Sequence, residues 1–151
     1  MCSQGIKNMI INSQSSKNVF PRKGKKMDET MLGREIEENE YGRLDTFEID
    51  GPMRINFYTK ELQALCPSVE GIQPDIYETT LSYRALTHAI ESKSLKLWLV
   101  QYRNQRIFGE HLAIELHRNL SSLNGIDDVQ VRLVQNIRGG IITDILYPSE
   151  I

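Results

Sequence analysis

The chain has 151 residues, of which 40% are hydrophobic and 25% charged, and its formal net charge is −2. This composition is typical of one globular domain that buries a core without metal or disulfide cross-links. It lacks the run of ~20 apolar residues that a membrane-spanning helix needs. The slight negative charge argues against a general nucleic-acid-binding protein, and two widely separated cysteines exclude a disulfide scaffold. The first residues show no secretory signal, so a cytoplasmic location without a membrane partner is expected.

Residues 1–45 differ in character from the rest of the chain. Residues 1–27 contain six lysines and arginines and no acid, whereas residues 28–48 contain eight acids and two arginines. Such a segment buries too little apolar surface to offset its chain entropy, so residues 1–45 are predicted to form a disordered arm, basic and then acidic. The arm is either a solvated tail or a weak anchor for RNA or for an acidic neighbour. Residues 46–151 are predicted to form the folded domain.

Strand-like patterns interrupted by turns occupy residues 47–86. Gly51-Pro52 interrupts residues 47–59, which are predicted to form a bent strand or a hairpin. Residues 62–74 contain two prolines and a glycine and are predicted to be a loop. Residues 75–86 alternate, with Tyr77, Thr79, Leu81 and Tyr83 on one side, which indicates a half-buried strand.

Two helices and two further strands complete the prediction. Residues 92–104 carry apolar side chains at helical spacing, with Ser92 placed to cap the helix start. Residues 111–123 repeat this spacing until a glycine ends it, and residues 128–137 and 139–147 alternate around a Gly-Gly turn. The order predicts an α+β fold, in which two helices cover one face of an antiparallel sheet. Four strands cannot close a barrel, so the open sheet edges predict assembly through those edges.

Cys66 lies in the predicted loop at residues 62–74. A cysteine in a rigidly framed loop can attack electrophilic carbon as its thiolate, and Asp75 could exchange the proton. The residue pattern also allows Cys66 to be a small buried side chain. No histidine has a spacing diagnostic of a Cys–His hydrolase. No metal site is expected, because the sequence contains neither a C-x-x-C nor an H-x-x-x-H pair.

Three other places carry groups suited to polar ligands. Glu91 precedes the first predicted helix and could accept two N–H donors from a guanine-like edge, while the nearby lysines and the helix start favour phosphate. Glu110 at the second helix could be another base-reading carboxylate, and Arg138 is placed to meet a phosphate. A capped amphipathic helix, an acid at a helix start and a Gly-Gly turn explain the same residues, and the pattern leaves both readings open.

Six short motifs favour the functional interpretation of these residues over the purely structural one. In chain order they are KELQALCP, QPD, ESKSLKLWL, YRN, FGE and IRGGI. Together they resemble the 7-cyano-7-deazaguanine reductases, the nitrile reductases of the queuosine pathway, which have the tunnel fold. The resemblance covers about residues 50–148. Its most specific part, ESKSLKLW, looks like the signature with which that family binds NADPH.

The resemblance implies a tunnel-fold ββααββ catalytic domain that assembles into a ring, a pentamer or a decamer, with active sites between subunits. It implies NADPH-dependent reduction of the nitrile of 7-cyano-7-deazaguanine to an aminomethyl group. Cys66 would attack the nitrile to form a thioimidate, and Asp75 would donate a proton. The implied substrate-binding residues are Ile90, Glu91, Ser92, Gly109 and Glu110, and the implied NADPH-binding residues are Ser92, Lys93, Lys96, Arg138 and Gly139.

The sequence departs from the family pattern at two places. Asp75 follows Cys66 by nine residues where the family has seven, and Gly109 replaces the histidine of a Phe-His-Glu motif. Two alternative functions therefore stay open. One is a tunnel-fold amidinotransferase that uses the same thioimidate on tRNA, where the basic arm could contact phosphates. The other is a non-catalytic binder of a purine-like ligand.

Overall fold

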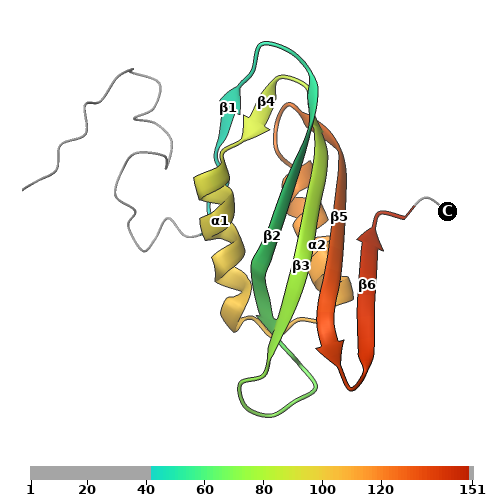
Figure 1. Ribbon diagram of the computed structural model, residues 1–151. Coiled ribbons are helices and arrows are strands. Elements are labelled where there is room, and N and C mark those ends of the chain that lie inside the picture. Colours follow the sequence, from blue (N-terminus) through green and yellow to red (C-terminus); the bar gives the residue numbers. More distant parts are fainter. Residues whose placement is uncertain (1–41, 150–151) are drawn as a thin grey trace, which may run out of the picture.

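A computed structural model describes residues 42–149, so nearly all of the predicted N-terminal arm lies outside the described residues. Its elements are β1 (Thr46–Glu48), β2 (Met53–Leu65), β3 (Pro74–Ala85), β4 (His88–Ile90), α1 (Ser92–Val100), the 3-10 helix η2 (Gln101–Asn104), α2 (Gly109–Ser121), β5 (Ile126–Arg138) and β6 (Ile141–Tyr147) (Figure 1). The predicted α+β class, with the helices placed between two pairs of long strands, is confirmed.

Four strands form one antiparallel sheet in the order β2-β3-β5-β6. Successive side chains of a strand point to opposite faces. In β3 the residues from Asp75 to Ala85 accordingly alternate between buried and more exposed positions, as predicted. The buried face of the sheet carries Tyr77, Leu81 and Tyr83, and β5 adds Val131 and Leu133 to it.

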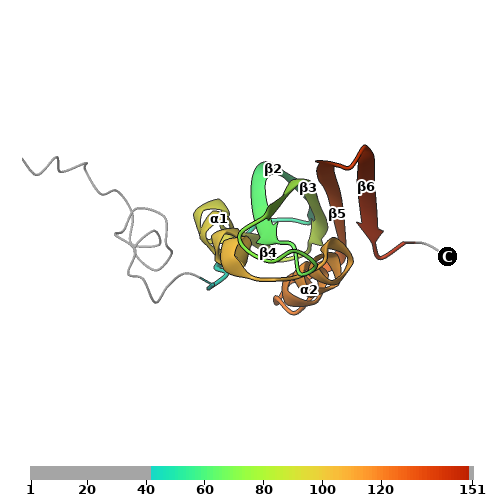
Figure 2. The ribbon, with the colours of Figure 1, turned by 90° about the horizontal axis from the view of Figure 1, so that it is seen from below.

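Both helices lie on that buried face, as Figure 2 shows. α2 packs on β5 and β6, with Leu112, Leu116 and Leu120 fully buried. This repeat of four residues is the stripe that predicted the helix. The glycine that ends the pattern, Gly125, has a φ of +74°, which favours glycine over other residues. The helices and the sheet therefore enclose one core.

The structure corrects the prediction in the region 47–74. β1 pairs with β4 in a separate two-stranded sheet, so no hairpin forms at Gly51-Pro52. β2 continues to Leu65, which leaves only residues 66–73 as a loop. The strand continues because Leu62 and Ala64 are buried and pair with β3 beyond a shift in register. Tertiary pairing thus extends a segment whose prolines and glycine predict a loop.

The outer strands of the main sheet are β2 and β6, and neither pairs with a further strand within residues 42–149. β6 exposes Ile141, Ile142 and Leu146. None of the helices in this part of the chain is long and apolar enough to cross a membrane.

Candidate active site

Cys66 is the first residue after β2. Its N–H donates to the Gln73 carbonyl at 3.0 Å, which extends the β2–β3 pairing by one position. Residues 67–72 form the loop between this pair, and the β2–β3 pairing is regular over the end of β2 that leads into it. Side chains alternate along a strand, so Cys66 lies on the same face of the sheet as Ala64. Ala64 pairs with Asp75, so Asp75 lies on this face too, diagonally across from Cys66. The structure thus places Cys66, which is partly buried, beside Asp75.

Asp75 is buried and forms an ion pair with Arg138 at the end of β5. The two residues meet because β3, which carries Asp75, is next to β5, which carries Arg138, in the sheet. Arg138 keeps 31% of its side chain exposed, whereas Asp75 keeps 4%. The residue implied as proton donor is therefore in direct contact with a residue implied to bind the cofactor. Gly139, next to Arg138, is exposed in the β5–β6 turn.

The start of α2 lies beside Cys66 because the preceding segment is bonded to the end of β2. The Leu65 N–H donates to the Gln105 carbonyl at 2.8 Å, and the Ile107 N–H donates to the Leu65 carbonyl at 3.2 Å. Glu110 lies in the first turn of α2 and is exposed, so its carboxylate is available to a ligand.

Tyr77 also belongs to this cluster, although the residue pattern predicts for it only a place on the buried face of a strand. Its hydroxyl oxygen is buried and has no hydrogen-bond partner among residues 42–149. Burial raises the pKa of Tyr77 far above its usual value, and the charges of Asp75, Glu110 and Cys66 raise it further. The phenol therefore stays protonated at any ordinary pH, close to all three groups.

Gly109 is buried under the same tyrosine. A Cβ atom at this position would lie 2.8 Å from Ile145 Cδ1 and 3.2 Å from Tyr77 Oη. A histidine at position 109 would therefore displace both side chains. Glycine thus stands where the family motif has histidine, and the ring of Tyr77 fills the space beside it.

Glu91 lies at the start of α1 and is only 4% exposed. Its carboxylate accepts the Lys93 N–H at 2.8 Å and the Ser94 N–H at 2.7 Å. Glu91 is therefore the N-cap of α1, and the cap predicted at Ser92 is wrong. Ser92 is instead the first helical residue and is exposed. Ile90, just before the cap, is buried and donates its N–H to Tyr83 Oη at 2.9 Å.

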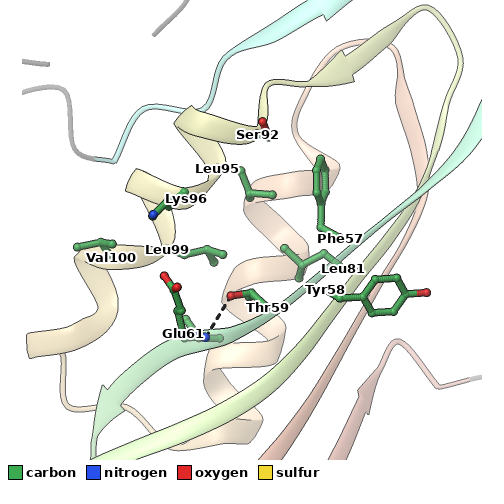
Figure 3. A pocket seen from close by; sticks show the side chains of 11 residues that line it. Phe57, Tyr58, Thr59, Glu61, Leu81, Ser92, Leu95, Lys96, Leu99 and Val100 are labelled. Atoms are coloured by element: carbon green, nitrogen blue, oxygen red, sulfur yellow. Dashed lines mark hydrogen bonds between the residues drawn. The ribbon is translucent and has the colours of Figure 1, made fainter. Parts of the chain in front are cut away.

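A groove of about 240 Å³ separates α1 from β2 (Figure 3). Ser92 and Lys96 line its α1 side together with apolar residues such as Leu95, and Phe57 and Tyr58 line its β2 side. A hydroxyl and an ammonium group beside aromatic and aliphatic surface match the chemistry of a phosphate-bearing dinucleotide. Glu61 also lines the groove, and the volume of the groove is below that of ordinary small-molecule sites, so these residues could hold only part of a cofactor such as NADPH.

The two groups of residues lie at opposite ends of the sheet. Asp75 is the second residue of β3 and Ala85 the last, and the ten residue steps between them span ~33 Å. Cys66 and the start of α2 lie at the Asp75 end, whereas β4 and the start of α1 follow the Ala85 end (Figure 1). A single chain therefore brings together Cys66, Asp75, Gly109, Glu110, Arg138 and Gly139, and holds Ile90, Glu91, Ser92 and Lys93 apart from them. Lys96 lies between the two groups, in the groove that Glu61 and Leu62 also line.

Comparison with known proteins assigns this arrangement to a family. The family model described as "QueF-like protein" matches residues 74–150. The chain belongs to the QueF-like family. It is 34% identical to the NADPH-dependent 7-cyano-7-deazaguanine reductase of Syntrophus aciditrophicus, over 74% of this chain and 79% of that protein. The proteins of the same name from Ruegeria sp. and Frankia casuarinae are 31% and 36% identical, over 80% and 65% of this chain and 77% and 78% of theirs.

The QueF-like match begins at Pro74. It therefore includes Asp75, the cap of α1, the start of α2 and the β5–β6 turn. Cys66 precedes the matched residues, and its place in the QueF-like site rests on the strand pairing that brings it to Asp75.

Proposed function

We propose that this chain is an NADPH-dependent nitrile reductase that converts 7-cyano-7-deazaguanine to 7-aminomethyl-7-deazaguanine. Relatives that carry the name of this activity, at 31–36% identity, support the proposal. The observation that carries it is the cluster at the end of β2 and the start of β3, where a partly exposed thiol, a buried carboxyl and a second carboxylate converge. These groups suit attack on an electrophilic carbon, proton transfer and recognition of a base.

The chemistry begins at Cys66. Its sulfur bonds to the nitrile carbon, one π bond of the carbon–nitrogen triple bond breaks, and the nitrogen takes up the proton to give a thioimidate. Asp75, on the same face of the strand pair, is the group that moves this proton. Glu110 accepts N–H donors of the base and orients it, which turns the attack into an effectively intramolecular step.

NADPH, when bound, supplies the hydrides that reduce the carbon–nitrogen bond. The residues proposed to hold it are Ser92, Lys93 and Lys96 of α1 together with Arg138 and Gly139. Their hydroxyl, ammonium and guanidinium groups are donors suited to phosphate.

Because a single chain holds the start of α1 at the opposite end of β3 from Cys66, we propose that the site forms between copies. The Cys66 end of one copy would meet the α1 start of another. The unpaired edges of β2 and β6 support a tunnel-fold subunit in a ring, a pentamer or a decamer, because edge pairing satisfies their free backbone groups.

The decisive experiment mixes the full chain with 7-cyano-7-deazaguanine, records the intact mass and the thioimidate absorbance, and then adds NADPH. We expect a mass increase of one substrate molecule, lost on addition of NADPH as NADPH is oxidised. Cys66→Ala is expected to abolish the adduct while the fold is retained. An adduct consumed by ammonia but not by NADPH would indicate an amidinotransferase. Absence of an adduct, with equal ligand affinity in Cys66→Ala, would indicate a non-catalytic binder.

A further inference from the structure

The side chain of Arg106 spans the loop that presents Cys66. Its Nη1 donates to the Cys66 carbonyl at 3.0 Å and to the Val69 carbonyl at 3.1 Å, and its Nη2 donates to the Gly71 carbonyl at 2.6 Å. Three carbonyls of one loop thus converge on one guanidinium group. A planar fork of N–H donors suits this arrangement, because its two nitrogens reach separate acceptors at fixed angles.

The backbone of Arg106 is itself fixed to the sheet. Its neighbours on both sides bond to Leu65, the last residue of β2, and Arg106 forms an isolated bridge with the same residue. The guanidinium group therefore reaches the loop from an anchored point, and it connects the loop to the end of the strand that carries Cys66.

The loop has few other constraints. Residues 68–72 are exposed, and the side chain of Ile72 is 88% exposed. The loop is also two residues longer than the family pattern, and a longer loop has more conformations to lose. These residues depend on a contact from outside the loop to hold one conformation.

We propose that Arg106 is a positioning residue for the nucleophile. By holding the three carbonyls it keeps the Cys66 thiol on the face of the strand pair that bears Asp75. This inference rests on the proposed role of Cys66 in the reaction. Arg106 would then affect the rate at which Cys66 attacks the nitrile, independently of the free energy of unfolding of the whole fold.

The test uses the full chain with Cys2→Ser as background, so that Cys66 is its one thiol. Arg106→Ala is compared with Arg118→Ala, which removes an exposed arginine from the last turn of α2. At saturating 7-cyano-7-deazaguanine, we expect Arg106→Ala to form the adduct about tenfold more slowly or worse, because misplacement of a nucleophile by ~1 Å can lower a rate a hundredfold. Arg106→Lys should recover part of the rate, and Arg118→Ala should match the parent.

Hydrogen exchange gives a second readout that needs no substrate. Arg106→Ala should speed exchange of the amides of residues 68–73 and leave the amides of α2 and β5 unchanged. If Arg106→Ala does not fold, Arg106→Lys and Arg106→Gln replace it in both measurements. A parental adduct rate at saturation in a folded Arg106 variant would overturn the proposal, as would parental exchange in the loop. If the parent forms no adduct the proposed function fails, and exchange together with alkylation of Cys66 by iodoacetamide still decides the role of Arg106.

Discussion

Tyr77 and Gly109 show how two residues of the site are fitted to one another. The space beside Gly109 is filled by the Tyr77 ring and by Ile145. The Tyr77 hydroxyl gains no hydrogen bond within residues 42–149 in exchange for its burial. A buried polar atom without a partner lowers stability. The packing of the free chain therefore does not explain why the Tyr77 hydroxyl lies among Cys66, Asp75 and Glu110.

Replacement of Tyr77 tests this at the scale of one oxygen atom. We expect Tyr77→Phe to leave the free energy of unfolding unchanged or to raise it by about 1 kcal/mol, because it removes a desolvated hydroxyl that has no partner. Tyr102→Phe is the matched control, since the buried Tyr102 donates to Glu115 at 3.2 Å, and its loss should lower stability. Urea unfolding measures both variants. A similar loss of stability in the two would contradict the prediction.

At the scale of elements, α1 depends on its cap. Glu91 satisfies two N–H groups at the helix start from a buried position. We expect Glu91→Ala to lower the free energy of unfolding by about 1–2 kcal/mol, measured by chemical denaturation. Ser92→Ala should have a smaller effect, because its side chain is not the cap. The reverse order of the two effects would restore Ser92 as the cap.

Ion pairs on the outer face of the sheet make the stability of the fold depend on pH. Arg84 bonds to Asp127 across β3 and β5, and Arg132 bonds to Asp144 across β5 and β6. These hydrogen bonds hold the pKa of each carboxyl below its usual value. The stabilisation is therefore complete above the unfolded pKa of ~4 and is lost as the pH falls through the lower folded-state value. Because the groups are exposed, the effect is small.

We expect Asp127→Asn with Asp144→Asn to flatten the dependence of stability on pH below about 4 and to leave its shape near neutral pH unchanged. Denaturation midpoints between pH 2 and 7 measure this. An unaltered acid slope in the double variant would contradict the assignment.

At the scale of the whole molecule, the division of the site between the two ends of the sheet makes a prediction about mixed assemblies. Cys66→Ala damages one end, and Ser92→Tyr obstructs the other. Each variant alone should be inactive. Co-refolded mixtures should regain NADPH oxidation, because some interfaces then combine two intact ends. Activity no higher than that of the separate variants would place the site within a single chain.

Local patterns in the sequence predict the α+β class, the order of the long strands and helices and the half-buried face of β3. These features follow from periods of two and about four residues, which depend on neighbours close in the chain. The sequence also placed Cys66, Asp75 and Glu110 as candidates through short motifs.

The contacts between distant segments are visible only in the folded chain. The pairing of β1 with β4, the extension of β2 past its predicted end and the hold of Arg106 on the Cys66 loop each join residues that lie far apart in the sequence. The separation of Cys66 from the α1 start along β3 is visible only there as well. Such contacts form because they satisfy backbone groups and bury side chains across the whole fold, and their free energies depend on where the complete chain places each partner.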